Sequence, residues 1–159
     1  MPLTVYLDTS VVSAYFDSRT PDRQRDTQVF WQEASKNCQL IVSDVVFLEI
    51  AGTPKFEKRA MLNRLVEGLP VLLMNPATHA LANEFVKENL VPEKKLEDAQ
   101  HLALAIVHGL DFLVSWNFQH MVNYKTVHRL PVIAAKNQYF NRLSILSPSA
   151  FRDVIEEEK

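Results

Sequence analysis

The chain of 159 residues has a single cysteine, Cys38, and only three glycines. One cysteine allows neither an internal disulfide nor a zinc site built from several thiolates, so we expect a reducing, cytoplasmic setting. The chain also lacks an excess of positive charge, because its formal net charge is −2. Bulk positive charge therefore does not hold a nucleic acid here, although a local basic patch or a bound metal ion could still do so.

Long hydrophobic runs are missing as well. The N-terminal apolar segment has no basic stretch ahead of it and is interrupted by Asp8, so we expect neither a signal peptide nor a membrane span. Hydrophobic residues make up 47% of the chain and charged residues 23%, a composition typical of a soluble globular protein. A chain of this length fits one core of ordinary size, and we predict a single domain over residues 1–159.

Short apolar runs alternate with helical patterns along the chain. The runs that predict strands are residues 3–7, 39–42, 69–74 and 112–114, with a short edge strand at 143–146. Helical patterns begin after residue 8, pass through 28–31, start again at Ser43 and at Pro76, and cover 56–66, 96–108, 124–139 and 149–158. We expect Gly109 to cap the helix before it, and Pro131 to start, kink or split its own helix.

The remaining segments predict connections. Residues 19–25 contain Pro21 and read as a polar loop, and residues 92–95 read as a solvated link. Strands separated by helices require right-handed crossover connections, which produce parallel strands. The pattern therefore predicts a three-layer α/β/α fold around a mostly parallel sheet.

Three acids stand where such a sheet would place a site, beyond the carboxyl ends of its strands. Asp8 directly follows the first strand, Glu49 lies two turns into the helix after the second, and Asp98 opens the helix that returns to the fourth. Taken singly, each is more typical of a surface or helix-capping acid than of a site residue. Brought together, three carboxylates need a compensating cation, and no lysine or arginine is embedded in these apolar segments. Mg²⁺ or Mn²⁺ would supply that charge.

Three segments carry a resemblance to a known family: VYLDTSVVSAYF, SDVVFLEI and EDAQHLALAIVHGLDFLVSWN. In this order and spacing they resemble the PIN domain, and in particular the VapC-type ribonuclease toxins of prokaryotic toxin–antitoxin pairs. The resemblance implies a parallel sheet of five strands and Mg²⁺- or Mn²⁺-dependent cleavage of RNA. It implies that Asp8, Glu49 and Asp98 bind the metal. It also implies a homodimer and a small antitoxin protein as a possible partner.

One part of the chain departs from the family pattern. Such sites usually carry a fourth acid just after the fourth strand, and the segment here is SWNFQHM, with Asn117 and His120 at the two candidate positions. Asn117 could contribute a carbonyl oxygen or hold a water molecule in the catalytic site. We expect weaker metal affinity, a stricter substrate requirement or loss of activity. The alternative function is therefore a catalytically impaired PIN-like domain that binds RNA or protein.

Several polar side chains accompany the acids. We expect Thr9 and Ser10 to hydrogen-bond Asp8 or to cap the following helix, and Ser115 to retain a supporting hydroxyl. His101 shares a helix face with Asp98 at a spacing of three, and is interpreted as a core or supporting histidine. The other histidines have no metal-ligand spacing and are interpreted as surface or packing residues: His79, His108, His120 and His128.

A few other residues bear on RNA binding. Arg19, Arg23 and Arg25 could reach a phosphate chain, although an exposed polar loop explains them equally well. Trp116 could stack on a base, and burial under the last helix is the expectation we prefer. Asp111 precedes the fourth strand, so we expect it at the opposite end of the sheet from the site.

Two other classes that place an aspartate after a strand are disfavoured. A phosphoryl-transfer protein of the dehalogenase type needs a second acid where this chain has Ser10. A response-regulator receiver needs a phosphoacceptor aspartate after its third strand, where this chain has Asn75.

Overall fold

The computed structural model describes residues 2–157 and contains one five-stranded sheet. The strands are β1 (Leu3–Leu7), β2 (Cys38–Ser43), β3 (Val71–Leu72), β4 (Phe112–Val114) and β5 (Ser144–Leu146). Their order across the sheet is β3-β2-β1-β4-β5, and every neighbouring pair is parallel. The predicted parallel sheet is confirmed, and β5 is an edge strand as expected.

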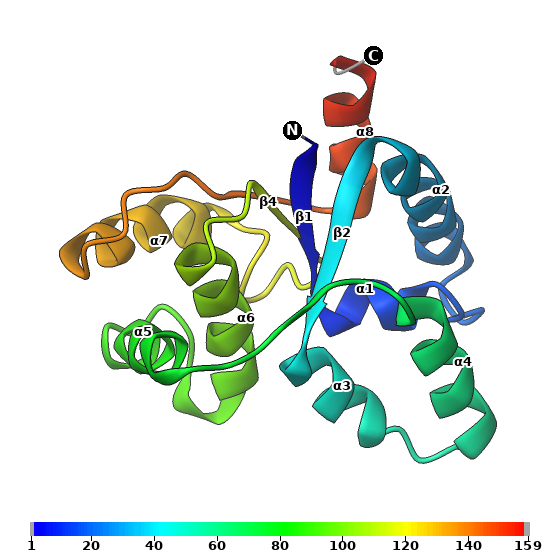
Figure 1. The fold of residues 1–159 in the computed structure, drawn as a ribbon, viewed down its shortest axis with the longest axis horizontal. Coiled ribbons are helices and arrows are strands. Elements are labelled where there is room, and N and C mark those ends of the chain that lie inside the picture. Colours follow the sequence, from blue (N-terminus) through cyan, green and yellow to red (C-terminus); the bar gives the residue numbers. More distant parts are fainter. Residues whose placement is uncertain (1, 158–159) are drawn as a thin grey trace.

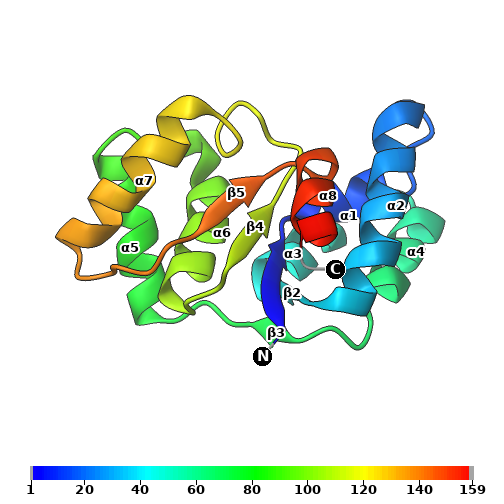
Figure 2. The ribbon, with the colours of Figure 1, turned by 90° about the horizontal axis from the view of Figure 1, so that it is seen from above.

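Helices cover both faces of this sheet. They are α1 (Thr9–Ala14), α2 (Pro21–Asn37), α3 (Asp44–Ala51), α4 (Phe56–Val66), α5 (Pro76–Lys87), the short 3₁₀ helix η1 (Glu93–Lys95), α6 (Leu96–Val107), α7 (Tyr124–Lys136) and α8 (Pro148–Glu157) (Figure 1). Helices α5, α6 and α7 lie on one side of the sheet, and α2, α4 and α8 lie on the other (Figure 2). The predicted three-layer α/β/α architecture is confirmed.

The strand period of two divides the core between these layers. On β1, Tyr6 packs with Leu102 of α6, while Val5 and Leu7 pack with Phe30 of α2 on the other face. A strand buried on both faces reads as a continuous apolar run, which is why LTVYL was recognisable in the sequence. Burial of each such large side chain contributes about 1.5–3 kcal/mol.

Parallel strands bring their carboxyl ends to one edge of the sheet. Asp8 follows β1, Ser115 follows β4, and Ser43 ends β2, so these three polar residues share that edge. Ser43 accepts a hydrogen bond from the N–H of Val46, which confirms it as the N-cap of α3. Asp111 lies at the opposite end, where its Oδ2 accepts the N–H of Thr4 at 2.9 Å, as the sequence predicted.

The predicted loop over residues 19–25 is wrong for most of its length. Helix α2 already begins at Pro21, with Thr20 at the N-cap position and Asp22 in the first turn. Proline suits the first position of a helix because its missing N–H would have no intrahelical partner there. Pro21 was therefore a start signal rather than a loop signal.

The third strand is shorter than the predicted residues 69–74. Only Val71–Leu72 pairs with β2. Pro70 offers only its carbonyl, which accepts the N–H of Val42, and the N–H of Met74 is taken by the side chain of Asp44 at 3.0 Å. Pro70 thus still accepts a bond from β2, while beyond β3 the side chain of Asp44 replaces the sheet as the partner of Met74.

Helix ends near the C-terminus also differ from the prediction. Helix α7 ends at Lys136, and Pro131 lies inside it, so the proline neither starts nor splits the helix. The cost of an interior proline, about 3 kcal/mol, is offset by the burial of neighbouring side chains such as Leu130 and Ile133. Helix α8 begins at Pro148, one residue earlier than expected, and the predicted end at Glu158 lies outside the described residues.

The end of α6 and the character of the helices agree with the sequence. Helix α6 ends at Val107, and Gly109 just beyond it has φ of +67°, the left-handed conformation that favours glycine at a helix end. No helix within residues 2–157 combines the length and the apolar character that crossing a membrane requires.

The packing of helix α8 should depend on one aromatic side chain, Phe151. The ring of Phe151 is fully buried and meets Phe30 and Phe112 edge to face, with centroids 5.4 Å and 5.0 Å away. Phe151→Ala should lower the free energy of unfolding by about 3–5 kcal/mol in urea denaturation followed by circular dichroism. Phe140 is 74% exposed, so Phe140→Ala is the matched control and should change stability by less than about 0.5 kcal/mol. Equal losses in the two variants would contradict this account.

Candidate active site

Asp8 is buried at the carboxyl end of β1, with 3% of its surface exposed. Its Oδ1 accepts a hydrogen bond from the hydroxyl of Ser10 at 2.6 Å, and its Oδ2 accepts one from Ser115 at 2.8 Å. A buried carboxylate is costly unless it is bonded in this way. Ser10 therefore contacts the first acid, as the sequence predicted, and Ser115 joins the ends of β1 and β4.

Glu49 projects from α3 toward a buried histidine. Its Oε1 lies 2.6 Å from Nε2 of His101 and accepts the hydroxyl of Thr9 at 2.8 Å. The other ring nitrogen, Nδ1, lies 2.6 Å from the hydroxyl of Tyr6, which in turn lies 2.7 Å from the hydroxyl of Ser43. Thr9 thus contacts the second acid instead of the first, and a hydrogen-bonded row of four side chains crosses from α3 to the end of β2.

Asp98 lies in the first turn of α6 and pairs with His120. Its Oδ2 is 2.8 Å from Nδ1 of the histidine. The backbone N–H of His120 donates to Oδ1 of Asn117, and the N–H of Asn117 donates to the hydroxyl of Ser115, both at 2.9 Å. Because Ser115 also donates to Asp8, a continuous path of hydrogen bonds connects Asp98 to Asp8.

The interpretation of His120 as a surface or packing residue was therefore wrong. Its side chain is 11% exposed and bonds a candidate site acid. The only sequence signal for His120 is that it occupies the second of the two positions at which the family carries a fourth acid. Asn117, at the first position, uses its carbonyl oxygen to cap the turn that orients His120.

The charges of the acids converge on His101. Burial lowers the pKa of His101, but the hydrogen bond to Glu49 and the negative charges of Asp8, Glu49 and Asp98 outweigh burial and raise it overall. Burial raises the pKa of Asp8, and the His101 charge and the two serine hydroxyls only partly oppose that rise. Burial also raises the pKa of Glu49, but the bond to His101 and its charge together with the Thr9 bond lower it overall.

Two of these acids have histidine partners in the structure. Nε2 of His101 lies 2.6 Å from Oε1 of Glu49, and Nδ1 of His120 lies 2.8 Å from Oδ2 of Asp98. Within residues 2–157, no three His, Cys, Asp or Glu side chains are close enough to hold a metal ion together. A protonated His101 would supply positive charge beside Glu49, and metal binding by the three acids stays a prediction.

The donor chemistry nevertheless fits a hard divalent ion. All three acids supply carboxylate oxygens, the ligands that Mg²⁺ and Mn²⁺ prefer. The hydrogen bonds within the described part of the chain use only Oε1 of Glu49 and only Oδ2 of Asp98. Each of these two acids therefore keeps a second oxygen for another contact. We conclude that Asp8, Glu49 and Asp98 match such an ion by donor type and charge.

A hollow of about 300 Å³ opens beside Asp8, between α1, the start of α2 and the segment after β4. Its lining includes Ser10, Asp17, Arg23, Trp116 and Asn117. The indole of Trp116 is buried as expected, but it bonds to α2 rather than to the last helix, since its N–H donates to the hydroxyl of Thr27 at 2.8 Å. Ser10 and Asn117 belong both to this hollow and to the hydrogen-bonded path between the acids.

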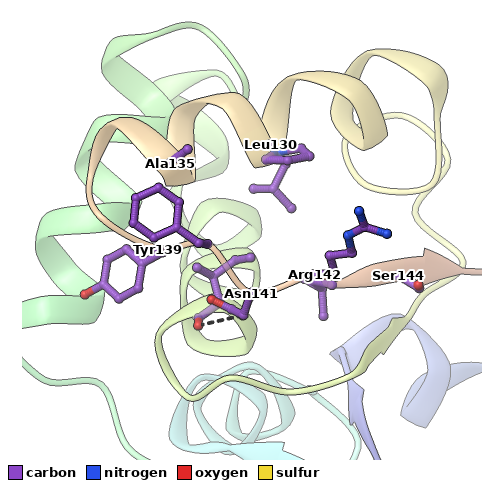
Figure 3. Close-up of a pocket in the computed structure, with 10 residues that line it drawn as sticks. Leu130, Ala135, Tyr139, Asn141, Arg142 and Ser144 are labelled. Atoms are coloured by element: carbon purple, nitrogen blue, oxygen red, sulfur yellow. Dashed lines mark hydrogen bonds between the residues drawn. The ribbon is translucent and has the colours of Figure 1, made fainter.

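A second cavity, of about 390 Å³, lies away from the acids. It is formed by α7 and the segment leading into β5, and Tyr139, Asn141 and Arg142 gather around it (Figure 3). Ser144 at the beginning of β5 lines it, which places it toward the amino end of the sheet. None of its lining residues is acidic, so it is not the candidate active site.

The comparisons with known proteins agree with this geometry. The sequence model of the PIN domain matches residues 5–117. The chain belongs to the PIN domain family. The matched region spans β1 to the turn after β4 and includes Asp8, Glu49, Asp98 and Asn117. No curated protein matches the sequence.

Solved structures show the same PIN fold. The chain superposes on VapBC2 from Rickettsia felis with a TM-score of 0.57 and 14% identity, covering 90% of this chain and 98% of that one. VapC20 from Mycobacterium tuberculosis, a toxin that cleaves the sarcin–ricin loop, gives 0.54 and 18%, with coverages of 73% and 92%. VapBC-1 from nontypeable Haemophilus influenzae gives 0.53 and 17%, with coverages of 72% and 87%. At these identities the likeness establishes the fold.

Because the pKa of His101 is raised, we predict that the melting temperature of the PIN domain in EDTA depends on pH. A folded-state pKa above the unfolded value of about 6.5 means that the folded state binds the proton more tightly. The resulting stability is fully present below about pH 6.5 and is lost as the pH rises through the folded-state pKa. The melting temperature should therefore fall over this range.

The dependence should be weaker in His101→Asn, which has no titrating ring at this position. His79 is exposed on α5, so His79→Asn is the matched control and should retain the wild-type slope. Thermal melts between about pH 6 and pH 9 measure both. A His101→Asn slope as steep as that of the wild type would show that another group titrates.

Proposed function

We propose that this PIN domain is a metal-dependent endoribonuclease that hydrolyses RNA phosphodiester bonds, and that it is the toxin of a toxin–antitoxin pair. The observation that carries the proposal is the hydrogen bonding of three acids at the carboxyl edge of the sheet. Asp8 bonds Ser115 at the end of β4, Glu49 of α3 bonds His101 of α6, and Asp98 is joined to Asp8 through His120, Asn117 and Ser115. Ligand sites of open parallel sheets lie at this edge. Membership of the PIN family supports the same reaction class.

Asp8, Glu49 and Asp98 would hold Mg²⁺ or Mn²⁺ in this proposal. The bound ion supplies positive charge to the phosphodiester and makes water a stronger nucleophile at neutral pH. The chain's own contribution is orientation. Ser10 and Ser115 each hold one oxygen of Asp8, so the carboxylate plane is fixed before substrate arrives.

The two histidines are positioning residues in the same proposal. His101 is held from its other side by Tyr6 and so presents a fixed Nε2 to Glu49. His120 is oriented by Asn117, which bonds its backbone N–H, and it holds Oδ2 of Asp98. Thr9, adjacent to Asp8 in the chain, adds a second bond to Glu49.

We propose a small antitoxin protein as the partner. Two of the similar solved structures are VapBC structures, one of them bound to a DNA fragment from their promoter. A hollow lies between α3, α4 and β3, and its lining combines apolar residues such as Phe47 and Val71 with Arg64 and Glu67. On the same two helices Leu48 is 72% and Phe56 69% exposed. Apolar surface of this kind is typical of a protein-binding face. A neighbouring reading frame for a small protein that copurifies with this chain would support the pairing.

The remaining parts of the proposal concern assembly and location. We propose that residues 1–159 form one PIN-like domain, that two copies pair as a homodimer, and that the protein acts in the cytoplasm. The fold supports the first part, because the described residues form one sheet with a core on each face. Light scattering after size-exclusion chromatography tests the homodimer.

A second function is favoured by a specific observation. Asn117 replaces the usual acid, His120 pairs with Asp98, and the described side chains form no ready three-ligand group. These features suit a catalytically impaired PIN-like domain that binds RNA or protein. The two functions differ in whether the purified protein cuts RNA at all.

Asp98→Asn should abolish cleavage of end-labelled RNA in Mn²⁺ or Mg²⁺, because the amide removes a charged ligand while preserving the size of the side chain. We expect at least a hundredfold loss of rate, about 2.7 kcal/mol of transition-state stabilisation. The adjacent Glu97 is exposed, and Glu97→Gln is the matched control that should cut within about twofold of the wild type. EDTA should stop both active proteins.

The outcomes separate the two functions. Equal cutting by Asp98→Asn and Glu97→Gln would mean a contaminant or a different site. Absence of cutting by the wild type across structured and unstructured RNAs would favour the binding module.

Asn117→Asp should strengthen Mn²⁺ binding by about tenfold, or about 1.4 kcal/mol, because it adds one negative charge and preserves the oxygen that caps His120. Asn123 caps α7 through its side-chain oxygen in the same way, so Asn123→Asp is a control that adds the charge elsewhere. Isothermal titration calorimetry measures both affinities. An affinity gain shared by the two variants would reflect net charge alone and would contradict a site at Asn117.

A further inference from the structure

The hollow beside Asp8 contains an arginine that pairs with no acid. Arg23, in the first turns of α2, lies over two aromatic rings, with its guanidinium carbon 5.2 Å from the centroid of Trp116 and 5.5 Å from that of Phe118. Within residues 2–157 the guanidinium of Arg23 makes no hydrogen bond or ion pair with a protein acceptor. Its donors therefore remain available to a ligand, while the aromatic rings limit where the group can lie.

The neighbouring arginines differ in this respect. Arg19 is bound to Asp17 through Nε at 2.9 Å and through a second nitrogen at 3.1 Å. Arg25 pairs with Asp22 one turn before it. The sequence left all three arginines as equal candidates for a phosphate contact, and the structure singles out Arg23.

The hollow has the polarity that a nucleotide requires. Ser10, Ser13, Thr20 and Asn117 line it, and hydroxyl and amide side chains can both donate and accept hydrogen bonds, as the edge of a base does. Asp17 also lines it, but Arg19 engages both of its oxygens and holds its pKa at about 2. A volume of about 300 Å³ accommodates a single nucleotide rather than a duplex.

The hollow is also connected to Asp8 by a residue of its own lining. Ser10, which lines it, donates directly to Asp8, and Asn117 bonds both Ser115 and His120. Phe118, the next residue, is 46% exposed and offers a ring at the surface for stacking. A nucleotide placed here would lie next to the phosphate held at the acids.

We infer that this hollow binds one unpaired nucleotide of the RNA, next to the bond that is cut, with Arg23 holding its phosphate and Phe118 stacking on a base. The inference rests on the proposed function for the position of the cut. The base bound in the hollow must be unpaired, because a paired base cannot reach the ring of Phe118 or enter the hollow. Arg23 and Phe118 are therefore RNA-binding residues, and their role is separate from that of the acids.

The test uses the full-length protein with Asp98→Asn as the common background, so that RNA is bound without being cut. The probes are fluorescein-labelled oligouridylate and oligoadenylate of about ten nucleotides and a duplex of the same length, which suit a site of a few nucleotides. Fluorescence anisotropy at constant salt gives each dissociation constant. Arg23→Gln and Phe118→Ala are the test variants, with Arg25→Gln and Phe140→Ala as matched controls.

We expect Arg23→Gln and Phe118→Ala each to weaken single-strand binding at least fivefold, with the controls within about twofold and the duplex bound poorly by all. Test variants that bind the single strands as tightly as the controls would overturn the inference. Phe118 lies at the surface, so Phe118→Ala decides the question if a thermal melt shows that Arg23→Gln is unfolded.

RNA cleavage by the wild-type protein, which retains Asp98, distinguishes this inference from the proposed function. Loss of binding in the test variants together with no cutting by the wild type would retain the nucleotide site and reject the nuclease. Cutting by the wild type with unchanged binding in the test variants would retain the nuclease and reject this site.

Discussion

The buried carboxylate of Asp8 is the constraint on which the site depends. With 3% of its surface exposed, it would cost several kcal/mol if its oxygens were unbonded. Ser10 and Ser115 satisfy one oxygen each, and Ser115 belongs to the end of the neighbouring strand. Ser10 also accepts the backbone N–H of Trp116 at 2.9 Å. The same bonds that make burial of the acid tolerable therefore fix β1, α1 and the segment after β4 relative to one another.

The remaining acids are bonded to histidines. His101 is buried and bonded on both ring nitrogens, and His120 is held by a turn that Asn117 caps. The pKa of His101 is raised by Glu49 and by the charges of the other acids, so this ring can supply positive charge beside them. The candidate site thus has histidines bonded to Oε1 of Glu49 and Oδ2 of Asp98, while the second oxygen of each acid stays open to a divalent ion.

A chain with a net charge of −2 has one arginine without an acidic partner beside the candidate site, within the described residues. Near the acids, Arg19 and Arg25 neutralise acids of their own, and Arg23 is held over aromatic rings without an acidic partner. Trp116 makes this arrangement rigid, because its indole is bonded to Thr27 on the same helix as Arg23. A local feature of three side chains, rather than bulk charge, supplies the contact surface for a phosphate chain.

The sequence by itself determined the parallel α/β fold, the strands β1 and β4, the cap of α3 at Ser43 and the placing of Asp8, Glu49 and Asp98 toward one edge. These features depend on residues only a few positions apart, through strand alternation, helix periodicity and capping. Tertiary structure alone decided the shortness of β3, the continuity of α7 through Pro131, the pairing of His120 with Asp98 across 22 residues and the place of Arg23 over Trp116. Each of these features depends on contacts between segments distant in the chain, where packing and hydrogen bonding outweigh local preference.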